Sequence, residues 1–235
     1  MSRIFITGDI HGDGNIGKLS FECWPESRDL TKDDYLIICG DFGLVWDDPQ
    51  SKQEVYWLNW LTKIKPWTTL FVDGNHENHV KLNSYPVEEW RGGKVHKITD
   101  SVIHLMRGQV FNINDCKWFT YGGAESIDKE WRTPYKSWWP QETPSLEDYN
   151  EAIHNLQTVD FKVDYVVTHA MPEDYVERYF PYRRGMNGNT TPFQLYDFKK
   201  IIEYKHWYCG HYHKDIDISD SFHMLYNDII EVKFS

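Results

Sequence analysis

In this 235-residue chain, polar side chains that could bind a metal ion stand directly after short apolar segments. They are carboxylates, an amide and imidazoles, with no thiolate among them. Such oxygen and nitrogen ligands suit Mn, Fe, Zn, Ni or Mg rather than a structural zinc cage, and Mn²⁺ is our first expectation. In chain order these side chains are Asp9, His11, Asp41, Asn75, His76, His169, His211 and His213.

The number of these side chains fits two divalent ions. Two ions about 3.5–4 Å apart can share one carboxylate, hold a hydroxide between them and stabilise both the attacking and the leaving oxygens at phosphorus. The residue types and their placement therefore predict chemistry on a phosphate group.

Five short apolar runs are expected to form the buried strands that position these side chains. Ligands of open α/β sheets bind beyond the carboxyl ends of the strands, so residues that are far apart in the chain can converge there. The five runs are Ile4 to Thr7, Tyr35 to Cys39, Thr69 to Val72, Tyr165 to Thr168 and His206 to Cys209.

Three helices and further strands are expected between these runs. Val55, Leu58, Leu61 and Ile64 repeat at three-residue steps, and a second helix places Leu146, Tyr149, Ile153 and Leu156 on one face behind a Ser145 cap. Thr191-Pro192-Phe193-Gln194 reads as an N-cap, a first-turn proline and a capping-box glutamine. Residues 95–121 and 222–234 alternate like antiparallel strands. The plan is a mixed α/β fold of two packed sheets with helices outside.

Two long segments, residues 125–144 and 171–190, fit neither a helical nor a strand period. Loops of this length inside a compact domain are usually functional or disordered. No Pro/Gly/Ser linker divides the chain, so we expect one domain over residues 1–235, with these two loops shaping the substrate cleft.

The sequence resembles the calcineurin-like metallophosphoesterase superfamily. The family's five blocks stand here in order over nearly the whole chain, as Gly8-Asp9-Ile10-His11-Gly12, Gly40-Asp41-Phe42-Gly43, Gly74-Asn75-His76-Glu77, Thr168-His169-Ala170 and Gly210-His211-Tyr212-His213. A single block would be weak support, but five in order are specific. The resemblance implies a four-layer α/β/β/α sandwich of two mixed sheets flanked by helices.

The resemblance also implies a role for each matched residue. Asp9, His11 and His213 would hold the first ion, Asn75, His169 and His211 the second, and Asp41 would bridge them. A hydroxide held by both ions would attack phosphorus without a covalent enzyme intermediate. His76 would lie beside the phosphate and donate a proton or hydrogen bond, Asn75 would also face the substrate, and Glu77 would orient or cap.

The chain departs from the protein Ser/Thr phosphatase branch at both of that branch's phosphate-binding arginines. It reads Gly43-Leu44-Val45-Trp46 where the branch usually has Val-Asp-Arg-Gly, and Asp73 where an arginine precedes the Gly-Asn-His-Glu block. If an arginine binds the phosphate, the candidates are Arg132, Arg183 and Arg184 in the two long segments.

Composition limits the partners. The net charge is −11, and no basic run exceeds a pair, which disfavours stable binding to duplex nucleic acid. Apolar runs are too short to cross a membrane, no signal peptide precedes the first strand, and the four cysteines form no C-x-x-C pair. We therefore expect a cytoplasmic protein acting on a small phosphorylated compound such as a nucleotide.

Other functions remain in competition with this one. A catalytically silent binding or scaffold protein of the same fold is the main alternative, and a protein phosphatase or a nuclease of the superfamily are two more. Trp138 and Trp139 could stack on a nucleobase, although packing is the favoured interpretation. Monoesterase and diesterase activity, the native metal and the oligomeric state stay open.

Overall fold

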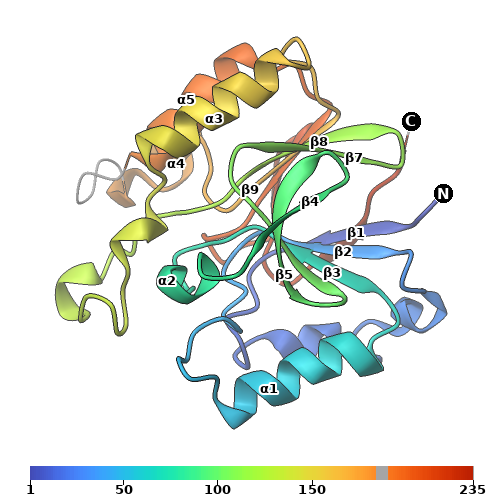
Figure 1. The fold of residues 1–235 in the computed structure, drawn as a ribbon. Coiled ribbons are helices and arrows are strands. Elements are labelled where there is room, and N and C mark those ends of the chain that lie inside the picture. The colour runs from blue at the N-terminus through green and yellow to red at the C-terminus, as the bar shows by residue number, and fades with distance from the viewer. Residues whose placement is uncertain (184–189, 235) are drawn as a thin grey trace.

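Two sheets lie face to face between two layers of helices (Figure 1). This computed structural model describes residues 1–183 and 190–234. Helix α1 (Lys52–Asn59) covers the outer face of one sheet, and α3 (Leu146–Gln157) and α5 (Thr191–Ile201) cover the other. The expected α/β sandwich of two mixed sheets is confirmed.

The first sheet has seven strands in the order β13-β1-β2-β3-β6-β5-β4. Strands β1, β2, β3 and β6 are parallel, whereas β13, β5 and β4 join as antiparallel neighbours. The strands are β1 (Ile4–Thr7), β2 (Tyr35–Ile38), β3 (Thr68–Phe71), β4 (Val87–Trp90), β5 (Gly93–Thr99), β6 (Val102–Leu105) and β13 (Ile229–Glu231).

The second sheet has six strands in the order β11-β12-β10-β9-β8-β7. Its four central strands are parallel, and β7 and β11 are antiparallel edges. The strands are β7 (Gln109–Ile113), β8 (Cys116–Tyr121), β9 (Tyr165–Thr168), β10 (His206–Cys209), β11 (Ile216–Ser219) and β12 (Phe222–Met224).

All five apolar runs form strands within one residue of the expected limits. Their central positions are buried on both faces, as parallel strands between two layers require. In β1, for example, Ile4 and Ile6 pack in the core between the sheets, and Phe5 packs in the separate core under α1. The expected antiparallel pairing in residues 95–121 is present as two hairpins, β5–β6 and β7–β8.

The expected apolar stripe of the first helix is only half right. Leu58 and Leu61 are buried, but Val55 and Ile64 are 43% and 59% exposed. Each three-residue step turns about 60° short of a full circle, so four such positions spread over half the helix circumference. The helix also ends at Asn59 and continues as a wider π-turn, η3 (Trp60–Ile64).

The caps of the other two expected helices differ in outcome. Ser145 caps α3, as expected from the sequence, and the structure adds a capping box with Asp148. Leu146, expected on the apolar face, is exposed. The prediction of a capping box at α5 is wrong. The N-cap is Thr190 rather than Thr191, and Oε1 of Gln194 accepts a hydrogen bond from the hydroxyl of Tyr121.

The two long segments contain short helical pieces that the sequence did not predict. Segment 125–144 holds the 3₁₀ turns η4 (Lys129–Trp131) and η5 (Pro140–Glu142). Segment 171–190 holds helix α4 (Glu173–Tyr179) and the turn η6 (Pro181–Arg183). The α4 helix buries the polar Glu173 beside Val176, which hides its period from a hydrophobicity pattern.

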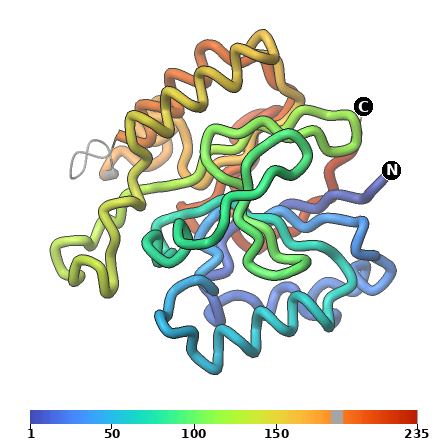
Figure 2. The backbone as a smooth tube through the Cα atoms, in the orientation of Figure 1, coloured from blue at the N-terminus to red at the C-terminus, as the bar shows by residue number. Residues whose placement is uncertain are grey.

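The remaining short helices are η1 (Ile16–Leu19), η2 (Pro25–Asp29) and α2 (His79–Leu82). The two chain ends emerge on one side of the molecule (Figure 2), and β1 runs from that side toward the opposite edge. Among the described residues, no helix has both the length and the apolar character that crossing a membrane would require.

Candidate metal centre

The side chains singled out in the sequence come from the carboxyl ends of five parallel strands. Asp9 and His11 follow β1, Asp41 follows β2, and Asn75 and His76 follow β3. The second sheet supplies the remainder, with His169 after β9 and His211 and His213 after β10. Since both sheets end at the same edge of the sandwich, residues up to about 200 positions apart meet there.

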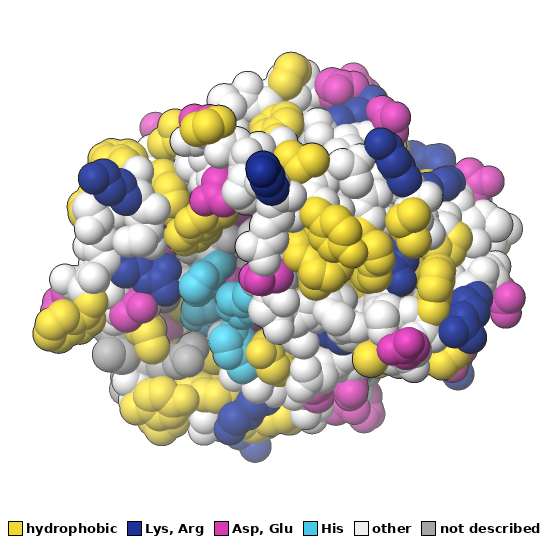
Figure 3. Space-filling model, turned by 90° about the horizontal axis from the view of Figure 1, so that it is seen from below, with side chains coloured by type: hydrophobic (Ala, Val, Ile, Leu, Met, Phe, Trp, Pro, Cys, Tyr) yellow, Lys and Arg dark blue, Asp and Glu magenta, His cyan; other side chains and the backbone are white. Residues whose placement is uncertain are grey.

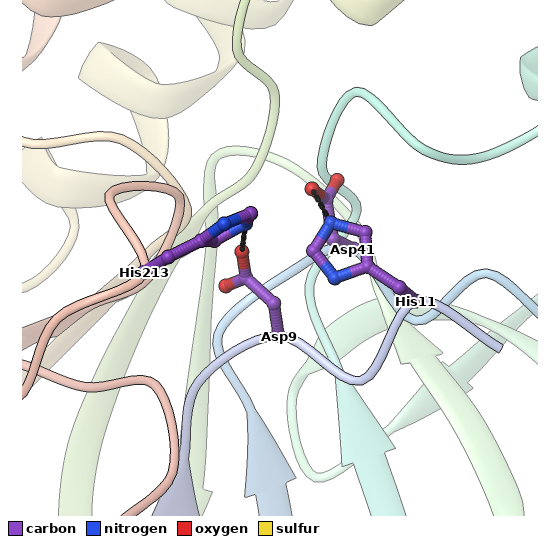
Figure 4. A group of neighbouring side chains, drawn as sticks. All are labelled: Asp9, His11, Asp41 and His213. Atoms are coloured by element: carbon purple, nitrogen blue, oxygen red, sulfur yellow. Dashed lines mark ion pairs between the residues drawn. The ribbon is translucent and has the colours of Figure 1, made fainter. Parts of the chain in front are cut away.

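These residues form two groups that share one carboxylate. The first group is Asp9, His11, Asp41 and His213, and the second is Asp41, His169 and His211. Within each group the candidate ligand atoms lie within 4.8 Å of one another. Figure 4 shows the first group, in which the Asp9 and Asp41 carboxylates each meet an imidazole.

Asp41 presents a different oxygen to each group. Its Oδ2 lies 3.1 Å from Nε2 of His11, and its Oδ1 lies 3.2 Å from Nε2 of His169. The same Oδ1 accepts hydrogen bonds from the backbone N–H groups of Asn75 and His76, both at 2.8 Å. Oδ1 of Asn75 lies 3.3 Å from Nε2 of His169, which adds an amide oxygen to the second group.

Asp9 supplies an independent indication of a cation. Its side chain is fully buried, and Oδ1 accepts the backbone N–H of His211 at 2.9 Å. Oδ2 has no hydrogen-bond partner among the described residues and faces Nε2 of His213 at 3.2 Å. A buried carboxylate oxygen without a donor is costly, and a bound cation would satisfy it.

His169 is oriented for ligation through Nε2. Its Nδ1 lies 2.7 Å from the carbonyl oxygen of Cys39 and must donate, because a carbonyl only accepts. Nε2 therefore faces Asp41 and Asn75. Burial opposes a charge on this ring, but the carboxylates of Asp41 and Asp9 together raise the pKa of His169 to about 10.

Four of the candidate ligands have a left-handed backbone. The φ angles are 47° at His11, 48° at Asp41, 70° at His211 and 52° at His213. Such values cost free energy for residues with a side chain and cluster at functional sites when the surrounding structure enforces them. The strain lies on the turns that aim these side chains at one point.

Two glycines are required because ligand side chains occupy the space of a Cβ atom. A Cβ on Gly74 would lie 2.1 Å from Oδ1 of Asp41, and one on Gly210 would lie 2.2 Å from Oδ1 of Asp9. These contacts are shorter than any Cβ makes, so both positions admit only glycine without rearrangement of the carboxylates.

Comparison with known proteins decides the family. The calcineurin-like phosphoesterase family model matches residues 2–215. The chain belongs to the calcineurin-like phosphoesterase family. The expected enzyme class, a metal-dependent phosphoester hydrolase, is confirmed at the level of this family.

Solved structures resemble this phosphoesterase only distantly. One is a provisionally assigned 5′-nucleotidase from Staphylococcus aureus, in complex with alpha-ketoglutarate, with 17% identity and a TM-score of 0.50. The match covers 95% of this chain but 48% of that one, so this chain spans about half the length of that protein. This likeness concerns the fold.

A second structure is the phosphopantetheinyl hydrolase from Mycobacterium tuberculosis, with 16% identity and a TM-score of 0.45. That match covers 96% of this chain and 88% of the other. Among curated protein sequences, no relative matches significantly.

In this calcineurin-like phosphoesterase, Glu77 connects the loops that carry Asp41 and Asn75. Its buried carboxylate accepts the backbone N–H of Phe42 at 2.6 Å through Oε1 and that of Gly74 at 2.7 Å through Oε2. Burial and the neighbouring Asp41 raise the pKa of Glu77. The residue has the contacts of the orienting group expected from the sequence.

A pocket of about 200 Å³ opens above the two groups. In Figure 3 the histidine side chains gather in a hollow bordered by basic, acidic and apolar side chains. The pocket is lined by His11, Asp41, Asn75, His76, Ile127, Asp128, Arg132, His211 and His213.

His76 lies on the wall of this pocket beside the first group. Its ring is 4.8 Å from the His11 ring and stacks on Trp46 at 6.3 Å. Burial lowers the pKa of His76, and the charges of His11 and Arg132 lower it further against the pull of Asp41. The imidazole is therefore neutral at pH 7 and can donate one hydrogen bond.

Of the three candidate arginines, Arg132 lines the pocket. It pairs with Oδ1 of Asp128 at 2.8 Å and donates to the carbonyl of Ser137 at 3.2 Å. Arg183 ends the turn η6 and its side chain is not described, while Arg184 lies outside the described residues. Asp128 and Ile127 could not be found from the sequence, because they lie in a segment without a regular period.

Asp73, which stands in the place of the phosphatase-branch arginine, does not line this pocket. It is buried and paired with Arg107, whose Nε lies 2.9 Å from Oδ2, and with Nε2 of His104 at 3.2 Å from Oδ1. Although burial opposes this, Arg107 and His104 hold the pKa of Asp73 far below its usual range.

Trp139 packs in the interior, as favoured from the sequence, whereas Trp138 is partly buried and makes a hydrogen bond. Trp139 is buried and meets the Trp46 ring edge-on at 4.8 Å. Nε1 of Trp138 donates to Oε1 of Glu142 at 2.6 Å. Neither residue lines the pocket above the candidate ligands.

Proposed function

We propose that this edge of the sandwich binds two divalent ions, with Mn²⁺ as the first choice and Fe, Zn, Ni or Mg as alternatives. The sharing of Asp41 between two ligand groups is the observation that supports the proposal most strongly. Asp41 would bridge the ions. The first ion would take Asp9, His11 and His213, and the second would take Asn75, His169 and His211.

The donor set fits this assignment. It combines carboxylate and amide oxygens with imidazole nitrogens, which suits these metals. The buried Oδ2 of Asp9 lacks a donor among the described residues, and the imidazole of His169 is already fixed through Nδ1. Bound cations would compensate the negative charge of the Asp9 and Asp41 carboxylates.

We propose hydrolysis of a phosphoester by direct attack of hydroxide on phosphorus. When bound, a pair of divalent ions supplies the activated water and neutralises charge on the phosphate. Neutral His76 would donate to the leaving or a non-bridging oxygen, and Arg132 and the Asn75 amide would bind phosphate oxygens. Among the described residues, no Ser, Thr or Cys lines the pocket, which supports a route without a covalent intermediate on such a side chain.

The substrate would be a small phosphorylated compound such as a nucleotide. A pocket of about 200 Å³ admits a phosphate and part of a leaving group. The net charge of −11 disfavours a long polyanion, which weakens the case for a nuclease on duplex nucleic acid. The buried pairing of Asp73 weakens the case for a protein phosphatase.

A catalytically silent scaffold is the competing function from another class. A silent relative is expected to have lost ligands or the catalytic histidine, whereas all seven candidate ligands and His76 are present in this chain. Capture of a stable partner without turnover on a broad panel of phosphoesters would favour the scaffold.

Two organisational proposals accompany the activity. We propose that residues 1–235 form one domain, supported by the apolar core that both sheets share. A reducing, cytoplasmic location is supported by the four cysteines, all of which are free thiols.

The test is hydrolysis of bis-p-nitrophenyl phosphate and p-nitrophenyl phosphate with Mn²⁺, for the wild type, Asp41→Asn and Asp33→Asn. Asp33 is an exposed aspartate and serves as the matched control. We expect activity in the wild type and in Asp33→Asn, and only background in Asp41→Asn. Equal rates for the wild type and Asp41→Asn would overturn the proposal.

A further inference from the structure

Ser126 and Glu142 form a buried chain of hydrogen bonds behind Asn75. Nδ2 of Asn75 donates to Oγ of Ser126 at 3.2 Å, and this Oγ donates to Oε2 of Glu142 at 2.8 Å. The backbone N–H of Ser126 donates to Oε1 of Glu142 at 2.6 Å. The exposed fractions are 5% for Asn75, 2% for Ser126 and 0% for Glu142.

We propose that Ser126 and Glu142 are positioning residues that make Asn75 present its oxygen, and not its NH₂ group, to the second ion. The inference rests on the proposed dinuclear site. It concerns residues that match none of the five sequence blocks, and it assigns a positioning function to the segment that follows β8.

The polarity of the chain is set at its buried end. Burial raises the pKa of Glu142 to about 7, so the carboxylate is ionised above that pH. An ionised carboxylate only accepts hydrogen bonds, so the Ser126 hydroxyl then uses its one proton toward Glu142. The hydroxyl oxygen can then only accept from Asn75, and the amide NH₂ is the end of Asn75 that can donate. Oδ1 therefore points the other way, toward Nε2 of His169 at 3.3 Å.

A flipped Asn75 would place two N–H groups at the second ion. An amide NH₂ has no lone pair to offer a cation, whereas the amide oxygen is a good ligand for Mn²⁺ or Mg²⁺. Outer contacts that orient ligands typically change metal affinity by about 10- to 100-fold.

Glu142 is itself held by contacts that do not involve Asn75. Nε1 of Trp138 donates to its Oε1 at 2.6 Å. Its backbone carbonyl accepts from the backbone N–H of Ala124 at 3.1 Å and from Nη2 of Arg107 at 3.2 Å. The carboxylate is therefore a fixed support, and its position does not depend on the amide that it orients.

The same support joins the ion site to the substrate side of the pocket. Ser126 is followed in the same segment by three residues that line the pocket, namely Ile127, Asp128 and Arg132. A single buried carboxylate thus fixes a proposed ion ligand and the base of the segment that carries the proposed phosphate-binding arginine.

Glu142→Gln tests the polarity with almost no change in shape. The Gln oxygen is expected at the Oε1 position, where two N–H groups point, so its NH₂ would face Oγ of Ser126 and donate to it. The hydroxyl proton is then free to turn toward Asn75, and the amide orientation is no longer enforced. Ser126→Ala removes the acceptor altogether.

The experiment is a Mn²⁺ titration by calorimetry of the wild type, Glu142→Gln and Ser126→Ala at about pH 8, where Glu142 is ionised. The matched controls are Glu147→Gln, at an exposed glutamate in α3, and Ser137→Ala, at a serine whose hydroxyl accepts from the backbone N–H of Thr133. We expect both test variants to retain the first ion and to bind the second about 10- to 100-fold more weakly, with wild-type affinities in the controls.

The outcomes separate the two proposals. A wild type that binds fewer than two ions would overturn the proposed dinuclear site itself. If the wild type bound two ions and the test variants bound the second ion with unchanged affinity, only the positioning role would be overturned. If both test variants bound both ions more weakly to the same extent and had a lowered melting temperature, the protein would be generally destabilised. That result would also overturn the positioning role.

Discussion

Oδ1 of Asp41 and Nε2 of His169 lie 3.2 Å apart in a part of the molecule where neither side chain is exposed. The distance fits a charged hydrogen bond, and the carboxylate raises the pKa of the ring to about 10. Both atoms belong to the proposed second ion site. Because a histidine must be deprotonated at the nitrogen that binds a metal, ion binding through Nε2 of His169 is expected to release a proton from this ring.

His76→Ala is expected to keep both ions and to lose turnover by about 100- to 10,000-fold, because His76 lines the pocket without belonging to either ligand group. The loss is expected to grow as the leaving group becomes poorer. Metal content by elemental analysis and kcat for a series of aryl phosphates measure the two effects. Loss of both ions would place His76 in the coordination shell instead.

Asp128→Asn is expected to favour monoesters. Arg132 pairs with Asp128 at 2.8 Å, so part of its charge is compensated before any phosphate arrives. Without the carboxylate, a dianionic monoester gains more than a monoanionic diester, by about two- to fivefold in kcat/KM for an exposed pair. The ratio of rates on p-nitrophenyl phosphate and bis-p-nitrophenyl phosphate reports the change, with Asp33→Asn as control. An unchanged ratio would mean that Arg132 does not bind the phosphate.

Arg107→Met is expected to destabilise the fold by about 3–5 kcal/mol, because it leaves the buried Asp73 carboxylate without its cation. Urea unfolding at pH 7 measures the loss. Adding Asp73→Asn to Arg107→Met is expected to recover part of it, and a double variant no more stable than the single one would contradict the pairing.

The wild type and Arg107→Met are expected to differ in the pH dependence of their free energy of unfolding. In the wild type the depressed pKa of Asp73 gives stability that is present above about pH 4 and is lost as pH falls below it. In Arg107→Met the strongest attraction on the Asp73 carboxylate is removed, so its pKa is expected to be less depressed and the loss of stability below about pH 4 to be shallower than in the wild type. A parallel pH dependence of the two proteins would contradict this account of Asp73.

Hydrolysis without a covalent intermediate predicts no transfer of the phosphoryl group to added methanol. In H₂¹⁸O one labelled oxygen is expected in each phosphate released in a single turnover. Methyl phosphate as a product, or protein that retains label from a ³²P-substrate, would contradict direct attack.

The sequence was sufficient to place the parallel strands and the residues beyond them. Buried parallel strands are apolar on both faces, so runs such as Ile4 to Thr7 stand out, and polar residues after them fall at one edge. Asp41 and His169 could be expected to meet on that ground. Their actual contacts, including the two oxygens of Asp41 facing different groups, required the structure.

Features that depend on contacts between irregular segments could not be predicted. Ser126 and Glu142 are 16 positions apart in a segment without a period, and only the fold brings their side chains together. The pairing of Asp73 with Arg107 spans 34 positions and involves a turn. The α4 helix was missed because its buried face contains Glu173.

The most direct test of the central claim is the electron paramagnetic resonance spectrum of the protein loaded with two equivalents of Mn²⁺. Two ions bridged by Asp41 at about 3.5–4 Å predict the spectrum of an exchange-coupled pair, and Asp41→Asn is expected to abolish the coupling. A wild-type spectrum with only the six-line signal of isolated Mn²⁺ would contradict the dinuclear centre.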